Sequence, residues 1–164
     1  MPSDSVHVQI GSTAPPITLP DQTGEMTTVP VGAPRGPTVL VFIRGHWCPY
    51  CRRYLSKLRA AFGRIAQRGA TLVVVSAEPI DTSAALHREL GLPFPILSDV
   101  AGTVIDTYGV RNLLLDVGTH LPHPSVFIID SAGVVRFRSV DRNYKKRTTI
   151  RTILKALDEV SVMM

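Results

Sequence analysis

Cys48 and Cys51 are the only cysteines of the chain, and they lie in the short segment WCPYC with Pro49 and Tyr50 between them. A C-x-x-C pair can supply two ligands to a metal ion, close a structural disulfide, or cycle between dithiol and disulfide as a redox couple. Structural disulfides are rare in a reducing compartment. The residues around the pair, and the elements that carry it, decide between these uses.

A structural zinc site is the metal alternative. Such a site needs four ligands, usually from two paired motifs. Beyond the cysteines the sequence offers His120 and His123, which have only an H-x-x-H spacing. Two unpaired cysteines in a core are the plainest alternative, because free cysteine is often buried. Both alternatives stay open, although a position between a strand and a helix argues against them.

The cysteine pair follows a predicted strand and opens a predicted helix. Residues 38–43 (TVLVFI) form a continuous run of β-branched and apolar residues, typical of a strand buried on both faces. Over residues 49–67 the apolar side chains recur at helical spacing, which predicts an amphipathic helix. Cys48 then lies near the N-cap, where unpaired backbone N–H groups and the helix dipole favour the thiolate. Pro49 suits the first helical position, because the N–H it lacks would be unpaired there.

Basic side chains close to the pair strengthen this expectation. Arg44, Arg52 and Arg53 flank the cysteines, and we predict a pKa for Cys48 well below the usual value of about 8.5. Cys51 lies almost one helical turn further on and on the same side, within reach of a disulfide. We therefore expect Cys48 to be the attacking cysteine and the less exposed Cys51 to resolve the adduct that Cys48 forms.

The rest of the chain alternates between strand and helix patterns. The first 37 residues are rich in Pro, Gly and Thr and predict turns and short edge strands. This order predicts an α/β fold with a central mixed β-sheet flanked by helices. We expect one domain over residues 1–164, with residues 1–37 as an extension packed on it. The further predicted elements are strands at 70–77, 125–130 and 134–140 and helices at 81–90 and 148–160.

Composition excludes several classes of partner. No apolar run approaches the roughly 20 residues of a membrane helix, and the first residues lack the pattern of a secretory signal. We therefore expect a cytoplasmic location without membrane contact. The formal charge of +5 comes partly from the segment DRNYKKRTTIR, residues 141–151, which holds a single aromatic residue, Tyr144. That segment predicts a solvated basic turn and no nucleic-acid site. No haem, flavin or nucleotide motif is present, so we expect no cofactor and no bound metal.

Three long segments resemble one known family. IGSTAPPITLPDQTG (10–24), LPFPILSDVAGTVIDTYGV (92–110) and SVFIIDSAGVVRFRS (125–139) resemble the alkyl hydroperoxide reductase and thiol-specific antioxidant family, the peroxiredoxins. WCPYC itself resembles thioredoxin and glutaredoxin sites. The resemblance implies a thioredoxin-like fold and a peroxide substrate. It also implies a dithiol reductant such as thioredoxin, glutaredoxin or glutathione, and it makes a homodimer plausible.

The sequence departs from that family at the site. Where family members carry Pro and then Thr or Ser before the reactive cysteine, this chain has Val41 and Gly45. Where they tend to carry Arg before the late strand, it has Pro124. Pro124 resembles the cis-proline of thioredoxin-type enzymes, which presents backbone to a partner. The resemblance therefore raises a cis His123–Pro124 bond as a hypothesis.

Other residues are candidates to replace the missing contacts. We predict that Arg44, Trp47 and Arg142 rebuild the contacts to peroxide or to the thiolate. Trp47 has a second interpretation, as a ring packed beside the disulfide. Arg142 and Arg147 have a plainer one, as surface charges. His46 either tunes the thiolate or is simply exposed.

Two functions follow from these features. In a thiol-dependent peroxidase, the Cys48 thiolate attacks the O–O bond, becomes a sulfenic acid, and condenses with Cys51. In a thioredoxin-like thiol-disulfide oxidoreductase, Cys48 forms a mixed disulfide with a protein or glutathione, and Cys51 resolves it. Gly45 and Pro124 favour the second function. The resemblance over the whole chain favours the first, which we prefer.

Overall fold

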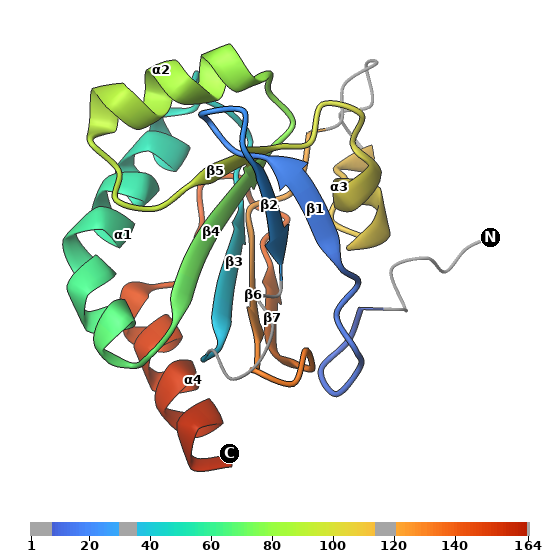
Figure 1. Ribbon diagram of the computed structural model, residues 1–164, viewed down its shortest axis with the longest axis vertical. Helices are drawn as coiled ribbons and strands as arrows, with labels where there is room; N and C mark the ends of the chain where they lie inside the picture. Colours follow the sequence, from blue (N-terminus) through green and yellow to red (C-terminus); the bar gives the residue numbers. More distant parts are fainter. Residues whose placement is uncertain (1–7, 30–35, 114–120, 164) are drawn as a thin grey trace.

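The computed structural model describes residues 8–29, 36–113 and 121–163, and within them helices cover both faces of a twisted sheet (Figure 1). None of the described helices has the length and apolarity to cross a membrane. In chain order the described elements are β1 (Ile17–Pro20), β2 (Met26–Val29), β3 (Thr38–Phe42), α1 (Pro49–Gln67), β4 (Thr71–Ser76), α2 (Ile80–Leu90), β5 (Ile96–Ser98), α3 (Thr103–Thr107), β6 (Ser125–Ile129), β7 (Val135–Val140) and α4 (Ile150–Met163).

The central sheet has the strand order β5-β4-β3-β6-β7. β3, β4 and β5 are parallel, whereas β6 and β7 run antiparallel to their neighbours. The mixed sheet predicted from the sequence is therefore confirmed, and the fold is the thioredoxin-like one. β1 and β2 form a separate antiparallel pair, in the region where short edge strands were expected.

Alternation along the strands divides the core into two layers. Val39 and Val41 of β3 point to a cluster that α1 fills with Leu55 and Leu58 and α4 with Leu157. The intervening residues of β3 point to the opposite cluster, closed by the β1–β2 pair and α3. A strand buried on both faces needs apolar residues at every position, which explains the unbroken run that predicted β3.

Strand direction brings four loops to one edge of the sheet. β3 and β4 both end there, at Phe42 and Ser76. Because β6 is antiparallel to β3, Ser125 pairs with Phe42 and β6 begins at this edge. Val140 pairs with Ser125, so β7 ends at the same edge. The segments after β3, β4 and β7 and before β6 therefore meet beside the first turn of α1.

The last helix begins later than its pattern predicted. The sequence predicted a helix from residue 148, and α4 begins at Ile150. The Thr149 hydroxyl oxygen accepts a hydrogen bond from the backbone N–H of Thr152 at 3.1 Å, and this capping contact marks the residue as non-helical. By contrast, α1 has the bounds that were predicted, residues 49–67.

Candidate active site

Cys48 is the N-cap residue of α1. Its backbone is extended, with φ −88° and ψ 113°, and its Sγ accepts a hydrogen bond from the backbone N–H of Cys51 at 3.4 Å. Pro49 occupies the start of the helix, as predicted. The first turn holds no acidic residue, so no carboxylate of that turn competes with the sulfur for the positive end of the helix dipole.

Both cysteines are reduced and enclosed. The exposed fraction is 1% for Cys48 and 0% for Cys51. The backbone N–H of Arg44, just after β3, donates to Cys51 Sγ at 3.3 Å. Each sulfur therefore accepts a backbone hydrogen bond, and the strand-to-helix connection holds the pair in place.

Two guanidinium groups donate to the sulfurs. Arg147 Nη2 lies 3.1 Å from Cys51 Sγ and 3.9 Å from Cys48 Sγ. Arg44 Nη1 lies 3.9 Å from Cys48 Sγ. The Nε atoms of both arginines are buried, without a hydrogen-bond partner among the described residues. The interpretation of Arg147 as a surface charge is therefore wrong.

The two thiols have opposite pKa shifts. Burial acts to raise the pKa of Cys48, but hydrogen bonds from the side chain and backbone of Cys51 and the charge of Arg147 outweigh it, and the pKa is lowered. Burial dominates for Cys51, whose donation to Cys48 raises its pKa further, although Arg147 opposes the shift. The site therefore favours one thiolate, on Cys48, and one thiol, on Cys51.

Aromatic rings surround the Arg44 guanidinium. Its Cζ lies 4.9 Å from the ring centre of Trp47 and 4.8 Å from that of Tyr144. Tyr144 in turn meets the Tyr50 ring edge-on, with centroids 5.7 Å apart. The exposed fraction of Trp47 is 50%, so its ring forms a wall of the site that solvent still reaches. Cation–π contact holds Arg44 beside Cys48.

Gly45 leaves room for these neighbours. A Cβ built on Gly45 would lie 2.5 Å from Trp47 Nε1 and 3.0 Å from Glu78 Oε2. The indole and the carboxylate thus occupy the space where a side chain at this position would begin. The Thr or Ser that family members carry at this position is absent here, and the indole of Trp47 lies where its side chain would begin.

A His–carboxylate pair, unnoticed in the sequence, fixes the segment before Cys48. Glu78, which follows β4, accepts from the His46 backbone N–H at 2.9 Å and lies 2.5 Å from His46 Nδ1. The Glu78 side chain is largely buried, whereas half of the His46 side chain is exposed. Glu78 could have been found only from topology, since it lies 32 positions away at the end of the neighbouring parallel strand.

Pro124 directly precedes β6, at the edge of the sheet where β3 ends, whereas Arg142 does not reach the sulfurs by any described hydrogen bond. Pro124 is buried before β6, and its carbonyl accepts from the Asp141 N–H at 2.8 Å. The N–H of His123 donates to the Val110 carbonyl at 2.6 Å. Arg142 is exposed, and its charge adds to the effect of burial in lowering the His123 pKa. The geometry of the His123–Pro124 bond stays a prediction.

The described residues contain no cluster of three or more His, Cys, Asp or Glu side chains suited to a metal ion. His120, part of the zinc alternative, lies outside the described residues.

Comparison with known proteins decides the family. The model of the AhpC/TSA family matches residues 10–138, which is most of the chain. The chain belongs to the AhpC/TSA family. The match ends before Arg147, so the arginine nearest the sulfurs lies outside the part of this AhpC/TSA chain that the family model describes.

Individual relatives agree with the family. Chloroplastic peroxiredoxin Q of Sedum lineare is 31% identical over 126 residues, which cover 77% of this chain and 66% of that protein. A putative peroxiredoxin of Mycobacterium tuberculosis is 31% identical over 125 residues, covering 76% and 80%. The chain thus spans slightly less than two thirds of the plant relative's length. The thiol-disulfide oxidoreductase ResA of Bacillus anthracis is 25% identical, covering 81% of this chain and 70% of ResA.

A solved structure has nearly the same extent. The crystal structure of peroxidoxin BcpB from Mycobacterium tuberculosis superposes with a TM-score of 0.80 at 28% identity, covering 96% of this chain and 99% of that one. A peroxiredoxin-like protein from Aquifex aeolicus gives a TM-score of 0.81 at 16% identity and supports the fold alone.

Proposed function

We propose that the protein is a thiol-dependent peroxidase that reduces hydrogen peroxide or organic hydroperoxides through the Cys48–Cys51 couple. The observation that carries the proposal is the placement of Cys48 at the N-cap of α1, with a lowered pKa and two guanidinium groups beside it. Membership of the AhpC/TSA family and the named peroxiredoxin relatives support it.

The first step uses the charge distribution around Cys48. Its thiolate attacks one peroxide oxygen, the O–O bond breaks, and the second oxygen leaves with its electron pair and takes up a proton. Cys48 becomes a sulfenic acid. Negative charge moves from sulfur to the leaving oxygen, and Arg44, Arg147 and the Trp47 indole N–H are the donors we assign to it. Preorganised donors of this kind stabilise a transition state without reorganisation.

The second step uses Cys51. Its sulfur attacks the sulfenic sulfur, water leaves, and a Cys48–Cys51 disulfide forms. Because burial raises its pKa, Cys51 stays protonated while Cys48 ionises, and this avoids two adjacent negative charges. Arg147 Nη2, 3.1 Å from Cys51 Sγ, is placed to stabilise the thiolate that must form when Cys51 reacts. Two electrons from a thiol reductant then restore the dithiol.

Thiol-disulfide exchange is the second candidate. The C-x-x-C pair, Gly45 in place of Thr or Ser, and the resemblance to ResA favour it. The segment around Pro124 gives this candidate little support. Its backbone groups would have to bind the chain of a partner, but the Pro124 carbonyl and the His123 N–H already form hydrogen bonds within this chain. A homodimer and a cytoplasmic location are further parts of the proposal, and the bacterial relative is consistent with that location.

Stopped-flow oxidation tests the choice. Reduced protein is mixed with hydrogen peroxide, the fluorescence of Trp47 is followed, and free cysteine thiolate is the reference. A peroxidase reacts at least about 10²-fold faster than the reference, the scale of one preorganised donor. A rate no better than free cysteine, together with fast exchange against glutathione disulfide, would make the protein an exchanger. Cys48→Ser should abolish both reactions, and Cys51→Ser should trap the first adduct.

A further inference from the structure

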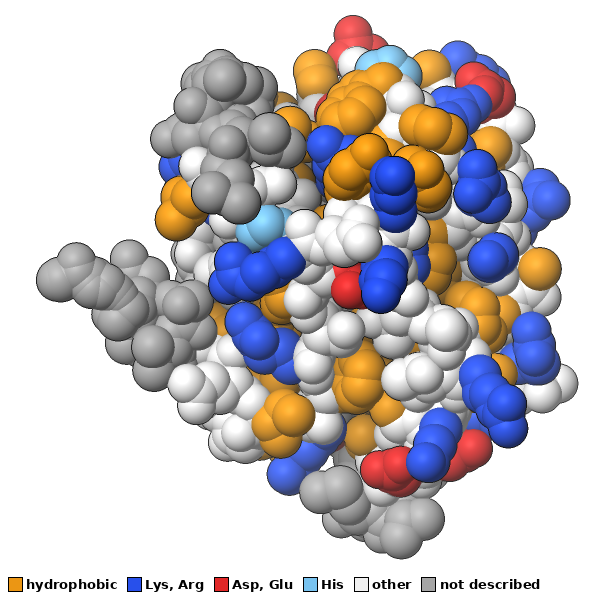
Figure 2. Space-filling model, turned by 180° about the vertical axis from the view of Figure 1, so that it is seen from behind, with side chains coloured by type: hydrophobic (Ala, Val, Ile, Leu, Met, Phe, Trp, Pro, Cys, Tyr) orange, Lys and Arg blue, Asp and Glu red, His pale blue; other side chains and the backbone are white. Residues whose placement is uncertain are grey.

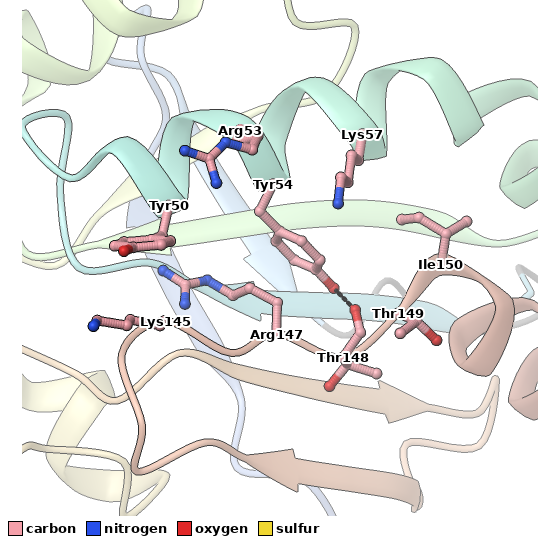
Figure 3. A pocket seen from close by; sticks show the side chains of 9 residues that line it. All are labelled: Tyr50, Arg53, Tyr54, Lys57, Lys145, Arg147, Thr148, Thr149 and Ile150. Atoms are coloured by element: carbon pink, nitrogen blue, oxygen red, sulfur yellow. Dashed lines mark hydrogen bonds between the residues drawn. The ribbon is translucent and has the colours of Figure 1, made fainter.

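A pocket of about 320 Å³ lies between the start of α1 and the segment that enters α4 (Figure 3). Its volume suits a small molecule rather than a protein. The residues that line it are Tyr50, Arg53, Tyr54 and Lys57 of α1, and Lys145, Arg147, Thr148, Thr149 and Ile150 from the other side.

The lining is cationic and carries no carboxylate. Arg53, Lys57, Lys145 and Arg147 contribute four positive charges, and neither Asp nor Glu lines the pocket. Among the described residues, none of these four cations forms an ion pair with a carboxylate. On the face that Figure 2 presents, Lys and Arg side chains are widespread and acidic side chains are few. Unneutralised cations in a concave site concentrate anions.

Hydrogen bonds hold the wall of the pocket in place. The Tyr54 hydroxyl donates to the Thr148 carbonyl at 2.6 Å, drawn as the dashed line in Figure 3. Burial raises the pKa of Tyr54, so this donor stays protonated. Arg147 Nη1 donates to the carbonyls of Tyr144 and Lys146 at 2.5 Å and 2.9 Å. The Arg53 guanidinium lies over the Tyr50 ring, 5.4 Å from its centre.

Arg147 joins the pocket to the reacting atoms. The same side chain that lines the pocket contacts both sulfurs, at 3.1 Å and 3.9 Å. An anion held by the pocket cations is therefore one side chain away from the cysteine pair. Hydrogen peroxide is neutral, so the three pocket cations other than Arg147 add nothing to its binding. A thiol reductant that carries carboxylates would gain both binding and a larger thiolate fraction.

We infer that this pocket binds a low-molecular-weight thiol that carries carboxylate groups, of the glutathione class, as the electron donor. The inference rests on the proposed function in so far as that function forms the Cys48–Cys51 disulfide. The donor thiolate attacks Cys48 Sγ, the S–S bond breaks, and Cys51 leaves as a thiolate beside Arg147 and takes up a proton. A second donor thiolate attacks the mixed disulfide, releasing the oxidised donor and the Cys48 thiolate.

The test measures disulfide reduction without peroxide. Protein oxidised with diamide is reduced by glutathione or by neutral 2-mercaptoethanol, and the ratio of the two second-order rate constants is compared between variants. In Lys57→Gln/Lys145→Gln the ratio should fall about tenfold. In Lys146→Gln/Lys155→Gln, which removes the same charge from exposed lysines outside the pocket, it should stay unchanged. Glutathione with a methylated sulfur should bind the first variant more weakly in calorimetry.

Three results would overturn the inference. One is an equal fall of the ratio in both double variants, which would indicate net charge alone. Another is no fall in either. The third is slower oxidation of the Lys57→Gln/Lys145→Gln protein by a carboxylate-bearing hydroperoxide with an unchanged thiol ratio, which would make the pocket an oxidant site. Slow oxidation by hydrogen peroxide with the expected thiol ratio would instead refute the peroxidase proposal and leave the pocket assignment standing.

Discussion

Two pockets of similar size flank the start of α1, and they differ in the charges of the side chains that line them. In the pocket of about 320 Å³ that Arg147 lines, every charged side chain is a cation. The second, of about 350 Å³, is lined by His46 and by charged residues of both signs, Arg52, Asp81 and Glu89. There Arg52 pairs with Glu89, and His46 pairs with Glu78.

The contrast shows which of the described cations are free of carboxylates and can therefore act on the cysteine sulfurs. Positive groups that are paired with carboxylates stabilise the loop after β3, but they offer little field to a sulfur. Arg44 and Arg147, which have no ion pair among the described residues, contact the sulfurs. Glu78 thus anchors the loop after β3 on one side, which we call the acidic side. Arg44 and Arg147 contact the sulfurs on the other, which we call the basic side. Each side can be tested separately.

The largest effect should come from Arg147. Replacing it in Arg147→Gln removes the charge that helps to lower the pKa of Cys48 and a donor to the leaving oxygen. We expect peroxide oxidation to slow about 10²-fold, the scale of one lost oxyanion donor. The midpoint of Cys48 ionisation should also move up. Stopped-flow fluorescence gives the rate, and the ultraviolet absorbance of the thiolate gives the midpoint.

Arg142→Gln is the matched control for that variant. It removes the same charge from the same segment, but Arg142 is exposed. We expect no more than about a fivefold change in rate, since exposed charges contribute only about 0–1 kcal/mol. Equal effects of the two substitutions would mean that the general field of the basic segment, and not contact with the sulfurs, activates Cys48.

The next effect concerns Gly45, which lies between the two sides. In Gly45→Thr the new Cβ would meet Trp47 Nε1 at 2.5 Å and Glu78 Oε2 at 3.0 Å. We expect Trp47 to be displaced, with a loss of about 1–3 kcal/mol in the free energy of unfolding, as for other overpacked sites. Urea denaturation and the emission maximum of Trp47 measure the two consequences.

Gly63→Ala is the comparison for that substitution. Nothing lies within 4 Å of a Cβ at Gly63, inside α1, and Ala is favoured over Gly there by about 0.5–1 kcal/mol. This variant should be slightly more stable, with unchanged Trp47 emission. If Gly45→Thr left the emission and the stability unaltered, the indole would not occupy the space that the structure gives it.

Local patterns were enough to predict one half of the site. The run of apolar residues before Cys48 and the helical period after it placed that cysteine at a helix N-cap, and the structure confirms this. Arg44 was predicted because it lies only four positions before Cys48. These features depend on spacing within about a dozen residues, where strand and helix periods are visible in the sequence.

The other half depends on contacts between distant segments. Arg147 reaches Cys48 across 99 positions, and Glu78 reaches His46 across 32. Both contacts follow from strand order, because the ends of β4 and β7 meet the end of β3. In the sequence Arg147 is one of several basic residues in a turn, and nothing local distinguishes it from Arg142.

An effect of similar size should distinguish Glu78 from Glu89, the carboxylates that pair with His46 and Arg52. Glu78→Gln removes the negative charge of a largely buried carboxylate and leaves one acceptor oxygen where Glu78 uses two, one for the backbone N–H and one for the ring of His46. We expect a loss of about 1–3 kcal/mol in the free energy of unfolding, as for other buried hydrogen-bonded groups. Glu89→Gln breaks an exposed pair with Arg52, and about 0–1 kcal/mol is expected. Equal losses in urea denaturation would contradict the anchoring role of Glu78.

The smallest effect is a pH dependence of stability that differs in sign between the two cysteines. Because the pKa of Cys48 is lowered in the folded protein, the unfolded chain holds more protons between that value and about 8.5. Stability of the reduced protein should therefore rise with pH across this window, and Cys48→Ser should lose the rise. The pKa of Cys51 is raised, so above about 8.5 the unfolded chain loses its proton first and stability should fall. Cys51→Ser should lose that fall. Urea denaturation at a series of pH values gives both slopes, and parallel profiles for the two variants would show that the basic side does not confine the charge to Cys48.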